Sequence, residues 1–150
     1  MRPGSGTGYQ ETPTLNSNGQ GHFSAVVNDK TSSIQYKLTY KGLATTVNVA
    51  HIHLGARGIA GGIAAFLCGG GGKPPCPPTG GTVTGTVVAS DVVAIPTQGL
   101  PAGDFADLVR AVRAGATYAN VHTTQFPAGE IRGQIGTELD VRQDEQVMDE

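Results

Sequence analysis

The sequence predicts a mainly β protein, a Greek-key antiparallel β-sandwich or barrel with one short α-helix. Three observations support this prediction. Seven short segments carry residue patterns typical of strands. Glycine and proline, which number 23 and 9 among the 150 residues, separate these segments. A single segment near residue 105 instead places its apolar residues at helical spacing.

The clearest strand pattern covers residues 32–40, where four apolar residues alternate with polar ones. This period of two is typical of a half-buried strand. Residues 22–27 precede it, and the polar segment 28–31 between them predicts a turn, so the two strands should pair as a hairpin. The other predicted strands cover residues 47–54, 63–67, 82–89, 118–123 and 130–135.

Residues 104–113 predict the helix. Acidic residues lie in its first turn and arginines in its last, and Gly115 follows where a left-handed residue commonly ends a helix. An apolar stripe along this helix is formed by Phe105, Leu108, Val109 and Val112. We expect the stripe to pack across one end or one face of the sheets.

The predicted β domain covers residues 8–137. Residues 1–7 contain glycine, proline and serine but no apolar stretch, so they predict a disordered leader, and no signal peptide is expected in this chain. Residues 138–150 hold six of the twelve acidic residues and predict an acidic, flexible tail.

The composition argues against two classes of partner. The net charge is −2 and only 15% of the residues are charged, whereas a protein that neutralises many phosphates needs a basic surface. No apolar run approaches the roughly 18 residues of a membrane-spanning helix. We therefore expect neither a nucleic-acid partner nor a membrane span.

Cys68 and Cys76 flank a loop rich in glycine and proline. Their spacing is too long for a redox Cys-x-x-Cys motif, and two cysteines are too few for a four-cysteine zinc site. We expect a disulfide, which predicts export to the periplasm, the medium or the cell surface. The alternative is a pair of free thiols in a cytosolic protein.

Three of the four histidines occupy positions that suggest a metal site. His51 and His53 are two residues apart in the predicted strand 47–54, so both imidazoles project from the same face. His122, in the predicted strand 118–123, should also lie on the outer face of the sheet. A lone strand histidine is usually solvated or hydrogen-bonded, but a His-x-His pair with a third equivalent histidine predicts metal binding.

The residue types alone do not decide which metal the imidazoles bind. Imidazole suits copper, zinc, iron and nickel, and the affinity order of the divalent ions favours copper. Three histidines with an open position also fit a hydrolytic zinc site, whose general base would be Glu130. Glu130 is equally explained as a surface strand residue or a partner of Arg132. Because imidazole must be neutral to bind a metal, we expect affinity to fall as the pH drops through about 6.

Three segments resemble the CHRD domain family, named for its occurrence in chordin. They are Ala-His-Ile-His-Leu-Gly at residues 50–55, Tyr-Ala-Asn-Val-His-Thr at 118–123, and the Pro-Ala-Gly-Glu-Ile-Arg-Gly-Gln-Ile segment at 127–135. The predicted helix and residues 8–13 match as well, so the resemblance covers residues 8–136. Members of this family are typically secreted or cell-surface proteins, which again implies export.

A weaker resemblance is to copper/zinc superoxide dismutase, itself a Greek-key β-barrel. It implies that His51, His53 and His122 bind copper, and that Arg132 attracts and orients superoxide. No histidine lies between His53 and His122, so the bridging histidine and zinc loop of that enzyme have no counterpart. The resemblance therefore implies a single, copper-only site.

His22 is a candidate fourth ligand if its strand lies beside the other three histidines. Residues that could support His122 from a second layer are Tyr118, Asn120, Thr123 and Glu130. Tyr118 and Asn120 are equally explained by packing and by hydrogen bonds at a sheet edge.

The expected function is that of an exported mononuclear copper protein with superoxide dismutase-like activity, acting on superoxide or another small anion. Two alternatives stay open. One is a copper storage or delivery module without turnover. The other is an extracellular protein-interaction domain without metal, in which the histidines only hydrogen-bond to loops.

Overall fold

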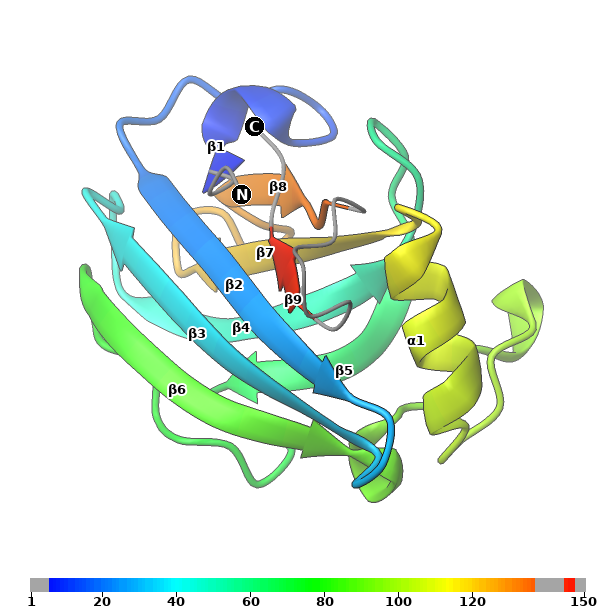
Figure 1. Ribbon diagram of the computed structural model, residues 1–150. Helices are drawn as coiled ribbons and strands as arrows, with labels where there is room; N and C mark the ends of the chain where they lie inside the picture. The colour runs from blue at the N-terminus through cyan, green and yellow to red at the C-terminus, as the bar shows by residue number, and fades with distance from the viewer. Residues whose placement is uncertain (1–5, 137–144, 148–150) are drawn as a thin grey trace.

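The computed structural model describes residues 6–136 and 145–147, in which the strands form one antiparallel sheet of order β5-β4-β7-β8-β1-β2-β3-β6, with β9 paired to β2 (Figure 1). The strands are β1 (Gly6–Thr7), β2 (Gln20–Asn28), β3 (Ser33–Lys41), β4 (Val47–Leu54), β5 (Gly62–Cys68), β6 (Gly81–Val88), β7 (Thr117–Thr123), β8 (Ile131–Gln134) and β9 (Glu145–Val147). The helices are η1 (Gly8–Gln10), η2 (Ala89–Asp91), η3 (Pro96–Gln98) and α1 (Phe105–Arg113).

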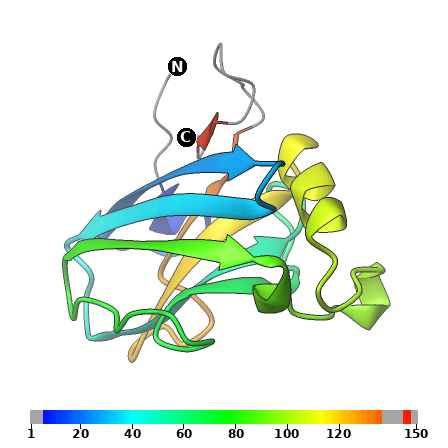
Figure 2. The same cartoon turned by 60° about the horizontal axis from the view of Figure 1, so that its bottom comes forward.

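The sheet folds over on itself into two layers. Figure 2 shows β2, β3 and β6 as one layer, lying over β4, β5 and β7. The phenol of Tyr36 on β3 reaches across the core and donates to the carbonyl of Leu67 on β5, at 2.6 Å. The predicted Greek-key antiparallel sandwich or barrel is therefore confirmed, as a nearly closed barrel.

The core forms where the strand patterns predict it. Ile34, Tyr36 and Leu38 on β3 are all buried, and the polar residues between them face outward. Gly85 lies opposite Tyr36 on β6, and a Cβ there would come within 2.4 Å of the phenol oxygen. Glycine at this position leaves the space that the large ring needs.

α1 covers one end of the sandwich, at the right of Figure 1. Asp104 caps it by accepting a hydrogen bond from the Asp107 N–H at 2.9 Å, and Gly115 follows it with a φ of 73°. The four residues of the predicted apolar stripe are all buried. The predicted helix is confirmed.

The seven predicted strands correspond to β2–β8, and their ends differ from the predicted ends by at most two residues. The short strands β1 and β9 were not predicted, because two or three residues carry no periodic signal. The predicted leader 1–7 lies outside the described residues except for β1, and the predicted tail 138–150 lies outside them except for β9. Within the part of the chain that the structure describes, no helix is long and apolar enough to cross a membrane.

Cys68 and Cys76 form the predicted disulfide, with their Cα atoms 5.1 Å apart. Cys68 is the last residue of β5 and lies opposite Ala50 of β4. The bond therefore ties the loop after β5 to the layer that carries the histidines.

Removing this disulfide is expected to lower the free energy of unfolding by about 2.5 kcal/mol, because the unfolded chain regains the freedom of the closed loop. Urea unfolding of the Cys68→Ala/Cys76→Ala double variant measures the loss. The wild-type protein under reducing conditions is the control and should show a similar loss. Equal stability of the double variant and the oxidised protein would contradict the prediction.

Candidate metal centre

The three histidines lie together because β4 and β7 are neighbours in the sheet. His51 pairs with Asn120 and His53 with Tyr118, while His122 lies diagonally across from His51, opposite Val49. Ile52, between the two histidines of β4, and Val121, beside His122 on β7, face the core. The three imidazoles therefore share the outer face of one layer, as the sequence predicted for His51 and His53 and for His122.

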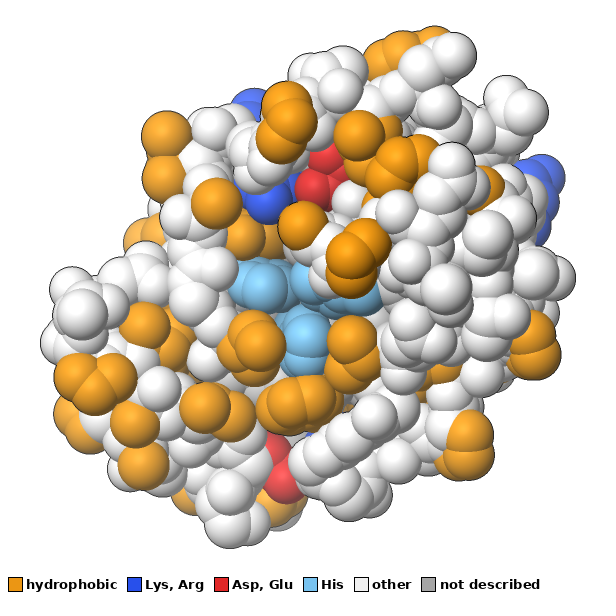
Figure 3. Space-filling view, turned by 180° about the vertical axis from the view of Figure 1, so that it is seen from behind, with side chains coloured by type: hydrophobic (Ala, Val, Ile, Leu, Met, Phe, Trp, Pro, Cys, Tyr) orange, Lys and Arg blue, Asp and Glu red, His pale blue; other side chains and the backbone are white. Residues whose placement is uncertain are grey.

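This outer face is covered, so the imidazoles are buried although they lie outside the barrel. His51, His53 and His122 are 5%, 7% and 8% exposed. Figure 3 shows their rings at the bottom of a hollow surrounded by hydrophobic side chains. The ring of Phe66 packs edge-on against His51, with the ring centres 4.5 Å apart.

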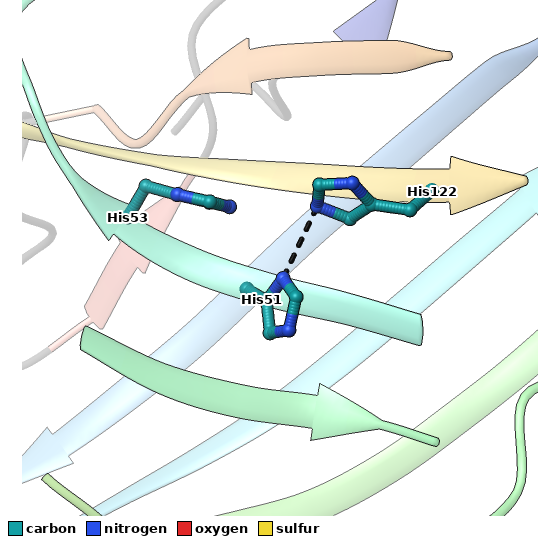
Figure 4. A group of neighbouring side chains, drawn as sticks. All are labelled: His51, His53 and His122. Atoms are coloured by element: carbon teal, nitrogen blue, oxygen red, sulfur yellow. Dashed lines mark hydrogen bonds between the residues drawn. The ribbon is translucent and has the colours of Figure 1, made fainter. Parts of the chain in front are cut away.

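The ring nitrogens converge. His51 Nδ1 lies 3.1 Å from His122 Nε2 (Figure 4), and one nitrogen from each ring lies within 4.8 Å of the other two. Imidazole nitrogens bind first-row metals at about 2.0–2.1 Å, so two ligands of one ion commonly lie about 3 Å apart. The His51–His122 pair already has that spacing.

Backbone carbonyls fix which nitrogens carry protons. His53 Nδ1 lies 3.0 Å from the Gly61 carbonyl, and His122 Nδ1 lies 2.9 Å from the Pro127 carbonyl. A carbonyl only accepts, so each Nδ1 carries the proton and each Nε2 carries a lone pair. His53 Nε2 is buried without a hydrogen-bond partner among the described residues. An unsatisfied buried acceptor beside two other imidazoles fits a metal ion.

The same geometry indicates which nitrogen each ring would offer to a metal ion. His53 and His122 offer Nε2, and His51 offers Nδ1, which points at His122. Without a metal, His51 Nδ1–H donates to His122 Nε2, because the Nδ1 proton of His122 is already committed to Pro127. Metal binding therefore requires His51 to move its proton to Nε2.

Burial keeps the three rings neutral. It lowers the pKa of His51 to about 3, with the neighbouring His122 and His53 adding to the effect, and lowers the pKa of His53 to about 4. Burial also lowers the pKa of His122. These shifts move the expected fall in metal affinity from about pH 6, the value for an ordinary histidine, to about pH 4.

The metal-free protein is expected to lose stability as the pH falls from about 6.5 towards 4.5. The three histidines bind protons more readily in the unfolded chain, so acid favours unfolding below their unfolded pKa of 6.5. Glu11, whose pKa is raised from 4.5 to about 7, mainly by burial, acts in the opposite direction and offsets one of them. We expect a net loss of at least about 1 kcal/mol per pH unit, measured by urea unfolding.

A matched variant tests the origin of this pH dependence. His53→Gln removes one of the proton-binding groups, so the slope of stability against pH should decrease. Stability of the wild-type protein that stays constant or rises on acidification would contradict the prediction.

His22 does not join the cluster. It is exposed on β2, where the alternating residues Phe23 and Ala25 face the core, so its side chain lies on the outer face of the other layer. The group that brings ligand atoms together contains the other three histidines alone among the described residues. The candidate role of His22 as a fourth ligand is therefore not supported, because β2 does not lie beside β4.

Glu130 is fully buried and holds loops together. Its carboxyl oxygens accept hydrogen bonds from the Ser17 hydroxyl at 2.6 Å, the Thr123 hydroxyl at 2.8 Å and the Ala44 N–H at 3.0 Å. Neither Glu130 nor Thr123 contacts an imidazole in any of these bonds. Both residues instead fix the chain around the end of β7, which carries His122.

Arg132 is also buried, at 4% exposed, and its guanidinium is engaged. It donates to the Ile59 carbonyl and to the Thr12 hydroxyl, each at 2.9 Å, and its Nε lies 3.6 Å from the Glu11 carboxyl. Asn120 donates to the same Glu11 carboxyl and to the Ile131 carbonyl. Asn120 therefore supports the Glu11–Arg132 pair rather than the ring of His122.

Sequence reasoning missed the residues that orient the rings. Gly61 and Pro127 act through their carbonyls, which every residue possesses, so no residue type marks them. Phe66 shows only as part of an apolar strand. In the sequence, the only indication that Glu11 could matter is that it belongs to a segment resembling the CHRD family.

A family model described as the CHRD domain matches residues 5–135. The chain belongs to the CHRD domain family. No curated protein and no solved structure matches it significantly. The disulfide and the CHRD domain are both compatible with an extracellular protein. The histidine cluster, the Glu11–Arg132 pair and α1 all lie within the CHRD domain.

Proposed function

We propose that this CHRD domain is an exported copper protein that binds one copper ion through His51 Nδ1, His53 Nε2 and His122 Nε2, and has superoxide dismutase-like activity. The observation that carries the proposal is the convergence of three buried, neutral imidazoles, two of them held by carbonyls so that Nε2 is available. The disulfide and the family support export.

The donor set favours copper over a hydrolytic zinc ion. An all-imidazole site suits copper, which leads the divalent affinity order. A zinc hydrolase needs a carboxyl base beside the metal. Among the described residues no aspartate or glutamate joins the cluster, and Glu130 is occupied by Ser17, Thr123 and Ala44.

A bound copper ion would supply one-electron chemistry by cycling between two oxidation states, oxidising one superoxide and reducing the next. The protein would provide neutral ligands that tolerate both states, and an anion would approach them through the hollow in which the rings lie. Arg132 provides a positive charge, whose field contributes to lowering the pKa of His53 and of His122. A field that reaches these rings also attracts an anion towards them.

A copper storage or delivery module is the second candidate, and the engagement of Arg132 favours it. Both terminal nitrogens of the guanidinium already donate to protein oxygens, those of Ile59 and Thr12. The Tyr118 ring, which the guanidinium covers at 3.8 Å, stands between Arg132 and His53. Arg132 is therefore poorly placed to hold an anion directly at the metal.

Copper content and superoxide turnover of Arg132→Ala separate these functions. If the protein is a dismutase, the variant should keep one copper and lose about tenfold or more of the rate, and added salt should slow the wild type more than the variant. Copper binding without turnover in the wild type would indicate storage or delivery. If the wild-type protein binds no copper, the remaining alternative is an extracellular protein-interaction domain without metal.

A further inference from the structure

We propose that Tyr118 is a positioning residue that fixes the ring and the tautomer of His53, and that Arg132 acts on the metal centre through Tyr118 as well as through its charge. The inference deepens the proposed copper site. Its first test uses metal-free protein, so the positioning role of Tyr118 and the proposed copper site can fail separately.

The first contact is a stack of three side chains. The rings of His53 and Tyr118 are parallel within 1°, with centres 4.8 Å apart. The Arg132 guanidinium carbon lies 3.8 Å from the centre of the Tyr118 ring. Because β7 lies between β4 and β8, His53 and Arg132 approach the Tyr118 ring from opposite sides. The ring of His53 is therefore stacked on the Tyr118 ring, and the Tyr118 ring is itself packed between His53 and Arg132.

The second contact runs through the phenol. Tyr118 Oη accepts a hydrogen bond from the Gly61 N–H at 2.9 Å, and the Gly61 carbonyl accepts one from His53 Nδ1–H at 3.0 Å. Tyr118 thus holds the residue whose carbonyl decides which nitrogen of His53 carries the proton. Only glycine fits there, because a Cβ on Gly61 would lie 1.7 Å from the Leu54 carbonyl oxygen.

Arg132 fixes the same loop two residues earlier. Its guanidinium donates to the Ile59 carbonyl, while its other end is held by Thr12 and Glu11. The segment 59–61 is therefore bound at two points, by Arg132 and by Tyr118. Both residues direct His53 Nε2 towards the other two imidazoles without touching a metal ligand position themselves.

A packing role and a positioning role predict different results for Tyr118→Phe. The variant keeps the ring, and so the stack, but removes the phenol oxygen that holds Gly61. If Tyr118 only fills space, His53 is unchanged. If Tyr118 positions His53, its Nδ1–H bond to Gly61 weakens.

Nitrogen NMR of the His53 side chain in the metal-free protein tests this directly. We expect a single Nδ1–H tautomer in the wild type, an Nδ1 proton that exchanges about tenfold faster in Tyr118→Phe, and a mixture of both tautomers in Tyr118→Leu. Tyr9→Phe is the matched control, because it removes an exposed phenol that bonds to Asn16. Folded Tyr118 variants with the wild-type tautomer and exchange rate would overturn the proposal.

Copper-loaded protein tests the role of Arg132. Tyr118→Leu should retain copper but change the copper EPR spectrum and the reduction potential. Arg132→Lys keeps the charge but loses the flat guanidinium over Tyr118, so it should change both readouts in the same direction. If Arg132→Lys matches the wild type, the guanidinium does not act through Tyr118. If the wild-type protein binds no copper, the proposed function fails while the NMR result on His53 still stands.

Discussion

Replacing His122 by alanine is expected to abolish stoichiometric copper binding. In the proposed site His122 is the one ligand from β7, and its Nε2 lies 3.1 Å from His51 Nδ1. Residues that merely orient a ligand commonly change metal affinity 10–100-fold, so loss of the ligand itself should reduce affinity by more than about 100-fold. Titration against a competing chelator measures the affinity, and EPR of the copper-loaded protein reports the nitrogen ligands.

His51→Ala and His53→Ala should behave in the same way, because each removes one of the three nitrogens that converge. His22→Ala is the matched control, since His22 is exposed on β2 and lies outside the cluster. It should bind copper with the wild-type affinity and spectrum. Retention of the wild-type spectrum in His122→Ala would show that the metal is held elsewhere.

Replacing Glu130 by alanine is expected to lower the free energy of unfolding by about 4 kcal/mol. The change removes a fully buried acceptor, which accepts from the buried Thr123 hydroxyl and from the part-buried Ser17 hydroxyl and Ala44 N–H. A buried donor left without a partner costs about 1–3 kcal/mol, a part-buried donor costs less because water can reach it, and the missing side chain leaves a cavity. Urea unfolding at neutral pH measures the loss.

Glu130→Gln keeps the volume and one acceptor, so it should lose roughly half as much and remain measurable if the alanine variant does not fold. Asp29→Ala is the control, because it removes an exposed ion pair with Arg113 that should contribute less than about 1 kcal/mol. Stability of Glu130→Ala within about 1 kcal/mol of the wild type would contradict the assigned role of Glu130.

Local patterns predicted the strands and the helix because they depend on spacing along the chain. The alternation in β3 and the stripe of α1 can both be read without knowing the fold. The shared face of His51 and His53 follows in the same way, from the period of a strand. The composition and the cysteine spacing likewise predicted the disulfide.

The meeting of His122 with His51 depends instead on the register between β4 and β7, which no local pattern encodes. That register includes an irregularity between Val47 and Val49, and β5 shifts twice against β4 beside the two histidines. The roles of Glu130 and Arg132 were also hidden, because their partners Ser17 and Thr12 lie more than 100 residues away along the chain. The lowered pKa values of His51, His53 and His122 depend on their burial in the fold, which no local pattern encodes.

All three imidazoles belong to β4 and β7, which are paired strands of one layer. The outward residues of β2, β3 and β6, in the other layer, contribute none of the three. Substitutions at well-separated sites act independently. Substitutions on the outer surface of β2, β3 and β6 should therefore leave the convergence of the three imidazoles unchanged, so that surface could be re-engineered for recognition without altering the histidine cluster.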